Sequence, residues 1–404
     1  MCGGMIKVRT RMRAKDTGPR NAFWESLKDE DFFGSSVTHL YFYGRVTVES
    51  VQTLRSQVFD ATRTRTENRV NTDPRPIVVH VHSPGGDVRG MALFAAMMDH
   101  VTVPLCVMVD GMSASAATAL SVMAPYRVAT EYSMTMIHDY AGGSDGPRDM
   151  ILTTTDQIEK FREHLKAMYL HNTSFGPDEL EDLLHRDVFL DAKVCLAKGV
   201  YDRILFSGHA RGRSRHAMPH EFSNDAVFLK TNWNRFVYSC DAAAPQAFDA
   251  LLAFAENTKP IVMYFPGKGT CTDENISLVM IGRILASKAS VYAIVDGDVS
   301  WWQFLPVLFC HKRVMYDTAV IVSALTYDKA WGRKLADIVH NTETFREMFK
   351  TAFKSNRVDP AVLKDLFERP SIMTAADCKR LGLIDEVAVM SAKRTVRHRG
   401  SSKT

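Results

Sequence analysis

A serine, a histidine and an aspartate lie in three separate, well-punctuated segments of the first half of the chain. Ser115 lies in the small-residue segment 111–117, His138 ends the run Met136-Ile137-His138, and Asp187 precedes the apolar pair Phe189-Leu190. A hydroxyl is a poor nucleophile until a neighbouring base removes its proton, and an acid commonly orients that base. These three residue types could therefore perform the nucleophilic catalysis of a hydrolase.

The surroundings of Ser115 suit a nucleophile. We expect a strand that ends near Gly111 and an alanine-rich helix over 115–123, so that Ser115 projects from a helix N-terminus. The helix dipole and the unpaired N–H groups there favour developing negative charge. The alternative is that Ser113 and Ser115 only cap the helix, a common role for serine.

A glycine pair supplies candidate groups for an oxyanion hole. Ser83-Pro84-Gly85-Gly86 follows the apolar run 76–81. The N–H groups of Gly86 and Ala116 could bind the oxyanion of a tetrahedral intermediate, and losing one such donor costs about 10²–10³ in rate. Pro-Gly-Gly also suits an ordinary tight turn. Similarly, His138 could be one structural histidine among 14, and Asp187 could cap a turn.

The periodicity predicts an α/β fold. Strands are expected over 37–43, 76–82, 103–110 and 132–137, and helices over 49–62, 90–100, 115–123 and 149–171. Strands that alternate with helices form βαβ units with parallel strands.

The second half of the chain repeats this pattern without its reactive residues. Val109-Asp110-Gly111 matches Val295-Asp296-Gly297, and segment 183–202 matches 366–385. In that register the positions of Ser115, His138, Asp187 and Gly85-Gly86 hold Trp301, Ala324, Pro370 and Gly267-Lys268. We expect a tandem duplication with a degenerate second copy. The predicted divisions are a basic N-terminal extension 1–33, a catalytic domain 34–206, a basic linker 207–220, a degenerate domain 221–390 and a basic tail 391–404.

Composition narrows the class of protein. The net charge of +4 over 404 residues is too small to indicate a nucleic-acid partner, and no segment predicts a membrane span. Seven scattered cysteines without CxxC spacing argue against a disulfide framework or a zinc site, and they fit a reducing compartment. No metal or cofactor is expected. The basic segment 1–20 suits a mitochondrial-type presequence or a solvated tail, so a cytoplasmic or organelle-matrix location is expected.

The order Ser-Pro-Gly-Gly, Gly-x-x-Ala-Ser, Met-Ile-His and Arg-Asp-x-Phe-Leu resembles that of ClpP, the caseinolytic serine protease. The likeness covers about residues 37–205 and includes the intervals of 29 residues from Gly86 to Ser115 and 49 from His138 to Asp187. It implies two ClpP/crotonase-like ββα-superhelix domains, the first an endopeptidase with Ser115 as nucleophile, His138 as base and Asp187 as orienter.

The resemblance also implies binding residues and partners. Gly86 and Ala116 would be the oxyanion donors, and Gly85, Tyr140, Gly142 and Gly143 would line the groove for a polypeptide substrate. Helix 149–171 would be the handle through which two oligomeric rings stack, and an AAA+ unfoldase would feed them. Where the family usually has Gln-Pro after the histidine, this chain has Asp139-Tyr140.

Three alternatives stay open. The chain could be a catalytically silent assembly subunit of a ClpP-like complex. It could be a tandem hydrolase like the signal-peptide peptidases, although their Ser–Lys nucleophile lies in the second copy. It could also be an acyl-CoA enzyme of the crotonase superfold, which does not need a Ser–His–Asp order.

Overall fold

The computed structural model of the chain describes residues 19–67, 75–98, 101, 103–139, 148–207, 234–239, 241–254, 259–267, 275–322, 334–355 and 372–389. The chain divides into two compact units. The first comprises Met1–Leu205 with Lys329–Thr344, and the second comprises Phe206–Asp328 with Phe345–Thr404. The predicted linker 207–220 and tail 391–404 lie almost wholly outside the described residues.

A parallel sheet forms the centre of the first unit. Its strand order is β1-β2-β3-β4-β7, and the antiparallel pair β5–β6 joins it through β3. The strands are β1 (Thr38–Tyr43), β2 (Ile77–Ser83), β3 (Leu105–Ala114), β4 (Tyr126–Thr130), β5 (Met134–Met136), β6 (Phe189–Asp191) and β7 (Arg203–Leu205). The predicted α/β class with parallel strands is confirmed for this unit.

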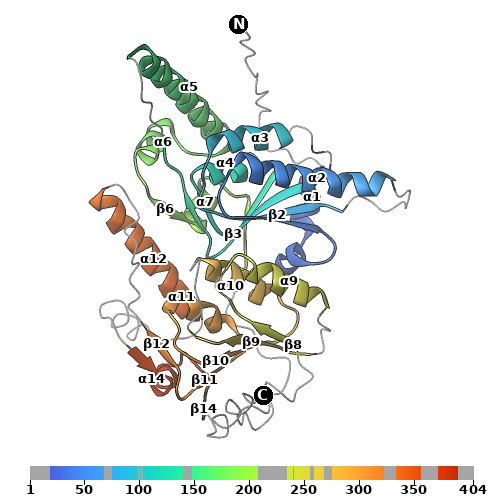
Figure 1. Cartoon of the computed structure of the whole chain (residues 1–404), viewed down its shortest axis with the longest axis vertical. Helices are drawn as coiled ribbons and strands as arrows, with labels where there is room; N and C mark the ends of the chain where they lie inside the picture. The colour runs from blue at the N-terminus through green and yellow to red at the C-terminus, as the bar shows by residue number, and fades with distance from the viewer. Residues whose placement is uncertain are drawn as a thin grey trace, which may run out of the picture. The chain divides into compact units, whose positions relative to one another are not determined.

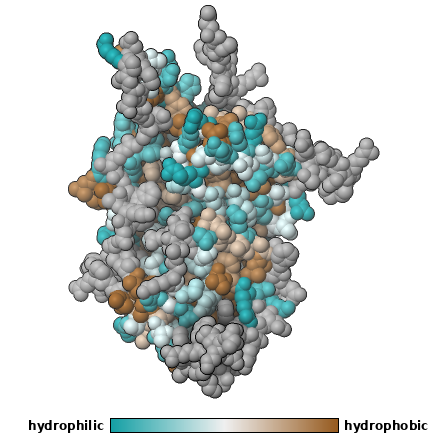
Figure 2. All heavy atoms as spheres, viewed as in Figure 1, coloured by the Kyte–Doolittle hydropathy of each residue, from teal (hydrophilic) through white to brown (hydrophobic). Residues whose placement is uncertain are grey.

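Helices cover one face of this sheet (Figure 1). The helices of the unit are α1 (Pro19–Ser26), α2 (Val48–Glu67), α3 (Val88–Met98), α4 (Ala116–Val122), α5 (Arg148–Asn172), α6 (Pro177–Leu184) and α7 (Ala192–Ala197), with the 3-10 turn η1 (Asp29–Phe33). Val51, Leu54 and Val58 recur at helical spacing along α2 and are buried in one core with Val79 and Val81 of β2. The outer side of α2 is largely hydrophilic (Figure 2).

Strand β3 is longer than the sequence predicts. We expected it to end near Gly111, but it continues to Ala114 because it changes partners. It pairs with β4 up to Val109 and with β5 from Met112, and the N–H of Met112 donates to Nδ1 of His82 in between. Ser115 therefore follows the last residue of β3 directly, with no loop between them.

The second unit has a parallel sheet with the order β14-β11-β10-β9-β8 and a separate antiparallel pair, β12–β13. The strands are β8 (Asn234–Val237), β9 (Ile261–Phe265), β10 (Val291–Val295), β11 (Lys312–Tyr316), β12 (Val320–Val322), β13 (Ile372–Thr374) and β14 (Glu386–Ala388). The helices are α9 (Ala244–Phe254), α10 (Ile276–Ala286), α11 (Trp301–Phe304), α14 (Ala375–Arg380) and the later part of α12 (Leu335–Ser355), with the 3-10 turn η2 (Leu305–Phe309).

Trp301 and Trp302 are core residues of the second unit. They are only 2% and 7% exposed, and their rings pack edge-on against Phe345, Phe349 and Phe353 of α12. The packing explains the aromatic composition of this part of the chain, since such pairs stabilise a core beyond the area they bury.

Within the described residues, no helix is both long and apolar enough to cross a membrane. A group of three or more histidine, cysteine or acidic side chains placed to hold a metal ion does not occur in that part of the chain either.

Candidate active site

Strand pairing alone brings the three reactive residues together. Ala114 of β3 lies opposite Met136 of β5, and Met136 lies opposite Phe189 of β6. Ser115 directly follows Ala114 in the sequence. His138 comes two residues after Met136, and Asp187 comes two residues before Phe189. All three side chains therefore leave the sheet at the same end. The N–H of Ser115 also donates to the carbonyl of Met136 at 2.8 Å.

The side chains form a continuous chain of hydrogen bonds. Oγ of Ser115 lies 2.7 Å from Nε2 of His138, and Nδ1 of His138 lies 2.7 Å from Oδ1 of Asp187. Because a carboxylate only accepts, Nδ1 carries the proton, and Nε2 is free to accept the serine proton. His138 and Asp187 side chains are 18% and 17% exposed, so the pair is largely shielded yet accessible. The arrangement can activate a hydroxyl.

The backbone of Ser115 decides against the helix-cap alternative. Its φ is 55° with ψ −127°, a conformation that non-glycine residues rarely adopt, and its side chain makes no cap bond to α4. The carbonyl of Ser115 is held instead by the N–H and hydroxyl of Thr118 at 2.9 and 2.6 Å. Strain of this kind costs of order 1–3 kcal/mol and clusters where a side chain must be presented to a substrate. Ser113 bonds to Ser121 at 3.0 Å.

The glycine pair lies beside the serine. Gly85 has φ 89°, and a Cβ there would come within 2.6 Å of the Ser115 Cβ and 3.1 Å of the Ala116 N. Gly86 has φ 153° and forms a bridge with Val46, where a Cβ would lie 2.2 Å from the Val46 carbonyl oxygen. The bridge uses the Gly85 carbonyl and the Asp87 N–H, not the Gly86 N–H. Ala116 begins α4, where backbone N–H groups have no partner inside the helix.

The charge that follows His138 is neutralised. The carboxylate of Asp139 accepts a hydrogen bond from Nε of Arg162 on α5 at 2.7 Å. The backbone N–H of Asp139 donates to the carbonyl of Leu184 at 2.8 Å. Arg162 also pairs with Glu181 of α6. Asp139-Tyr140 stands where Gln-Pro was expected from the resemblance, and the Asp139 carboxylate points toward Arg162 of α5. Tyr140, Gly142 and Gly143, the predicted groove residues, lie outside the described residues.

Glu181, which pairs with both Arg162 and Lys166, leads to a prediction about the stability of the fold in acid. Hydrogen bonds from Lys166 and Arg162 lower the pKa of Glu181 from 4.5 to about 2. A lowered folded pKa means that the stabilisation is present above the ordinary value and is lost as pH falls through about 2. We expect Lys166→Gln to raise the pH at which the chain unfolds in acid, as followed by circular dichroism.

Lys160→Gln is the matched control for that experiment. Lys160 lies on the same helix and pairs with Asp156, but both side chains are more than 60% exposed, at 71% and 63%. Exposed pairs of this kind contribute little. Equal acid midpoints for the two variants would contradict the role assigned to Glu181.

Sequence reasoning missed the residues that hold the Asp187 segment. Asp337 and Asn341 of α12, which the structure groups with the first unit, bond to the backbone of Asp187 and Phe189. The sequence-based division assigns both residues to the C-terminal domain. Nothing in their local sequence indicates contact with a segment about 150 positions earlier.

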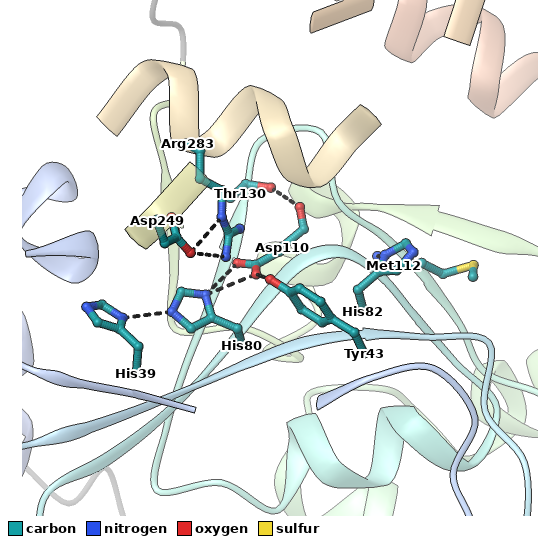
Figure 3. Close-up of polar contacts among 9 residues, drawn as sticks. All are labelled: His39, Tyr43, His80, His82, Asp110, Met112, Thr130, Asp249 and Arg283. Atoms are coloured by element: carbon teal, nitrogen blue, oxygen red, sulfur yellow. Dashed lines mark hydrogen bonds and ion pairs between the residues drawn. The ribbon is translucent and has the colours of Figure 1, made fainter. Parts of the chain in front are cut away.

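A second histidine–aspartate pair was also missed (Figure 3). Nδ1 of His80 lies 3.0 Å from Oδ2 of Asp110, both fully buried, while Nε2 lies 2.9 Å from Nδ1 of His39. The hydroxyl of Tyr43 donates to the same carboxylate at 2.5 Å. The two ring nitrogens of His80 are thus engaged by Asp110 and His39, so this pair is not arranged like His138 and Asp187.

Comparison with known proteins agrees with this geometry. Residues 66–208 match the Clp protease family. Over 178 residues the chain is 26% identical to the ATP-dependent Clp protease proteolytic subunit of Bacteroides fragilis, covering 42% of this chain and 86% of that protein. We call the part of the first unit that is similar to this family the Clp-type domain. The matched segment of this Clp-type domain contains Ser115, His138 and Asp187, and the resemblance predicted from the motifs is confirmed.

In the register predicted from the sequence, the part of the second unit aligned with the Ser115 segment differs from it. Trp301, aligned with Ser115, is buried, and the preceding Ser300 is an ordinary helix cap with φ −76°. Its hydroxyl accepts from the Gln303 N–H at 3.2 Å, while the Gln303 side chain accepts from the Ser300 N–H at 2.9 Å. Lys268, Ala324 and Pro370, the other aligned positions, lie outside the described residues.

Proposed function

We propose that this chain is a serine endopeptidase that hydrolyses peptide bonds of peptides or unfolded polypeptides in its Clp-type domain. The observation that carries the proposal is the pair of 2.7 Å contacts that joins Ser115, His138 and Asp187 in series. The match to the Clp protease family over the same residues supports it independently.

The roles follow from the geometry. Oγ of Ser115 attacks the peptide carbonyl carbon while Nε2 of His138 takes the hydroxyl proton, and the N–H groups of Gly86 and Ala116 bind the resulting oxyanion. As the C–N bond breaks, His138 gives that proton to the departing amine, which leaves an acyl group on Ser115. Water then attacks the ester with His138 again as the base, releasing the acid and restoring the hydroxyl. Asp187 keeps the imidazole in the tautomer that both steps require.

We also propose that the second unit is a degenerate tandem copy without catalytic function. Its sheet order matches β1-β2-β3-β4-β7 strand for strand, in parallel pairing throughout. An ion pair recurs as well. The N–H and Nε of Arg127 lie 2.9 and 3.3 Å from Oδ2 of Asp202, and those of Arg313 lie 2.8 and 3.3 Å from Oδ2 of Asp385. Gly85 and Gly267 follow equivalent strands with φ of 89° and 79°.

The partners are carried over by analogy. The Bacteroides fragilis relative is named as the proteolytic subunit of an ATP-dependent protease. We propose that this chain likewise works in an oligomeric ring with a separate AAA+ unfoldase, with α5 as the handle between rings. The four cysteines of the described residues, Cys106, Cys195, Cys310 and Cys378, form no disulfide, in keeping with the reducing compartment that we propose.

A fluorophosphonate probe tests the proposal. The probe phosphonylates only a serine whose proton is removed by a positioned base. We expect a single adduct, located by peptide mass spectrometry on Ser115, with labelling that stops when His138 is replaced by alanine. An adduct on another serine, or none in the assembled protein, would favour the catalytically silent subunit instead.

A further inference from the structure

Three residues on one face of α12 contact the segment that carries Asp187. Asp337, His340 and Asn341 are spaced three and four positions apart, so they share one side of the helix. Asp337 and Asn341 are fully buried or nearly so, at 0% and 3% exposure. Because the first part of α12, up to Thr344, belongs to the first unit, these contacts are internal to the Clp-type unit.

Asn341 bonds to the acid segment at two points. Its Nδ2 donates to the carbonyl of Asp187 at 2.8 Å, and its Oδ1 accepts from the N–H of Phe189 at 2.7 Å. In a parallel sheet, a residue of the neighbouring strand bonds to the carbonyl of one residue and to the N–H of the residue two positions later, as Asn341 does here with Asp187 and Phe189. The side-chain amide of Asn341 therefore satisfies the backbone hydrogen bonds of residues 187–189 that a paired strand satisfies elsewhere in the sheet.

The position of β6 explains why such a partner is needed. Among the described strands, β6 pairs with β5 alone, and no described strand lies along its other edge. The N–H and carbonyl of a strand residue point to the same side, and those of Phe189 point away from β5. Asn341 binds the N–H, and Nε2 of His340 donates to the carbonyl at 3.2 Å. Buried backbone groups left unpaired here would cost stability and order.

Asp337 holds the start of the same segment. Its Oδ2 accepts from the Asp187 N–H at 3.3 Å, and its Oδ1 accepts from Nε of Arg186 at 3.1 Å. Burial by itself raises the pKa of Asp337, but the hydrogen bonds from Arg186 and Asp187 outweigh it and leave that pKa below 3.8. The carboxylate is thus kept charged by the segment that it binds.

We infer that Asp337, His340 and Asn341 form a clamp on the backbone of residues 186–189 that positions the carboxylate of Asp187 against His138. The inference rests on the proposed function, because positioning matters only if Asp187 orients a base. Asp187 reaches His138 through a short side chain, so the place of its carboxylate follows the place of its backbone. A shift of about 1 Å in such a group can cost about 10²-fold in rate.

The clamp also gives the second half of the chain a part in the chemistry of the first. α12 continues without interruption from the clamp residues into residues 345–355 of the second unit, where Phe345, Phe349 and Phe353 pack in the core.

Asn341→Ala in the full-length chain tests the clamp. We expect kcat for a peptide substrate to fall about 10–10²-fold with KM unchanged, since the substrate-binding residues are not touched. Hydrogen exchange, followed by mass spectrometry on the peptide covering residues 184–191, should become faster. Asp337→Asn, which retains an acceptor for the Asp187 N–H, should lower kcat less than Asp337→Ala.

Val339→Ala is the matched control, because Val339 lies on the same helix and is 60% exposed. It should leave kcat and exchange at their original values. Unchanged exchange at 184–191 in Asn341→Ala would overturn the clamp, as would an equal fall in kcat in the control. If the unaltered chain cleaves no peptide and takes no fluorophosphonate, the proposed function fails, and the exchange experiment still decides whether the clamp exists.

Discussion

Replacing Ser115 by alanine is expected to lower peptidase turnover by about 10⁶-fold, the loss that follows removal of the nucleophile in other serine hydrolases. In the proposed mechanism this hydroxyl becomes acylated. The described hydroxyls of Ser113 and Thr118 are held elsewhere, since they bond to Ser121 and to the Ser115 carbonyl. The measurement is kcat on a fluorogenic peptide at saturating substrate, with near-ultraviolet circular dichroism to verify that the fold is retained.

Ser300→Ala is the matched control in the second unit. Ser300 precedes its helix as Ser115 precedes α4, but its side chain caps that helix through Gln303. Its loss should therefore cost about 1 kcal/mol of stability and leave turnover intact. An equal loss of turnover in both variants would show that the assignment of an active and an inert copy is wrong.

The difference between the two serines shows what the sequence could and could not predict. Small residues around Ser115 indicated a strand–turn–helix setting, but a capping role was equally compatible with that pattern. The choice depends on a backbone torsion of 55° and on the bond to His138. Both arise from the pairing of β3 with β5, a tertiary contact that the local sequence does not encode.

The elements of the first unit could be predicted because their apolar positions repeat with clear periods. The buried run of β2 and the spacing of Val51, Leu54 and Val58 in α2 are examples. The end of β3 was placed too early because Gly111 suggests a break. In the structure β3 continues past Gly111 by changing its partner strand, which a single-sequence reading cannot detect.

Most residues that act through long-range polar contacts could not be predicted from the sequence. Asn341 lies in a helix whose sequence is merely amphipathic, and its partners Asp187 and Phe189 are more than 150 positions away, at 154 and 152. His80 and Asp110 interrupt two apolar strands, and Asp110 stands out only as part of the repeated Val109-Asp110-Gly111. The Arg162–Asp139 pair could have been suspected, since an acid directly after the histidine needs a partner when it is mostly buried.

Asp187→Asn should lower kcat by about 10⁴-fold, as removal of the orienting carboxylate does in a serine protease triad. The amide keeps the size of the side chain, but its NH₂ group cannot accept from Nδ1 of His138 and its oxygen carries no full charge. His138 then loses the partner that holds its proton on Nδ1 and stabilises the imidazolium formed when Ser115 is acylated. The measurements are kcat and the rate of fluorophosphonate labelling, both of which should fall.

Asp187→Asn also distinguishes the role of the Asp187 carboxylate from the role of the clamp that holds its backbone. The clamp bonds to the N–H and carbonyl of residue 187, which asparagine retains, so hydrogen exchange over 184–191 should stay slow in Asp187→Asn although turnover is lost. Asn341→Ala should show the reverse balance, with fast exchange and a smaller loss of turnover. If Asp187→Asn instead keeps near-normal turnover, the 2.7 Å contact with His138 is structural, and both the role of Asp187 and the purpose of its clamp must be abandoned.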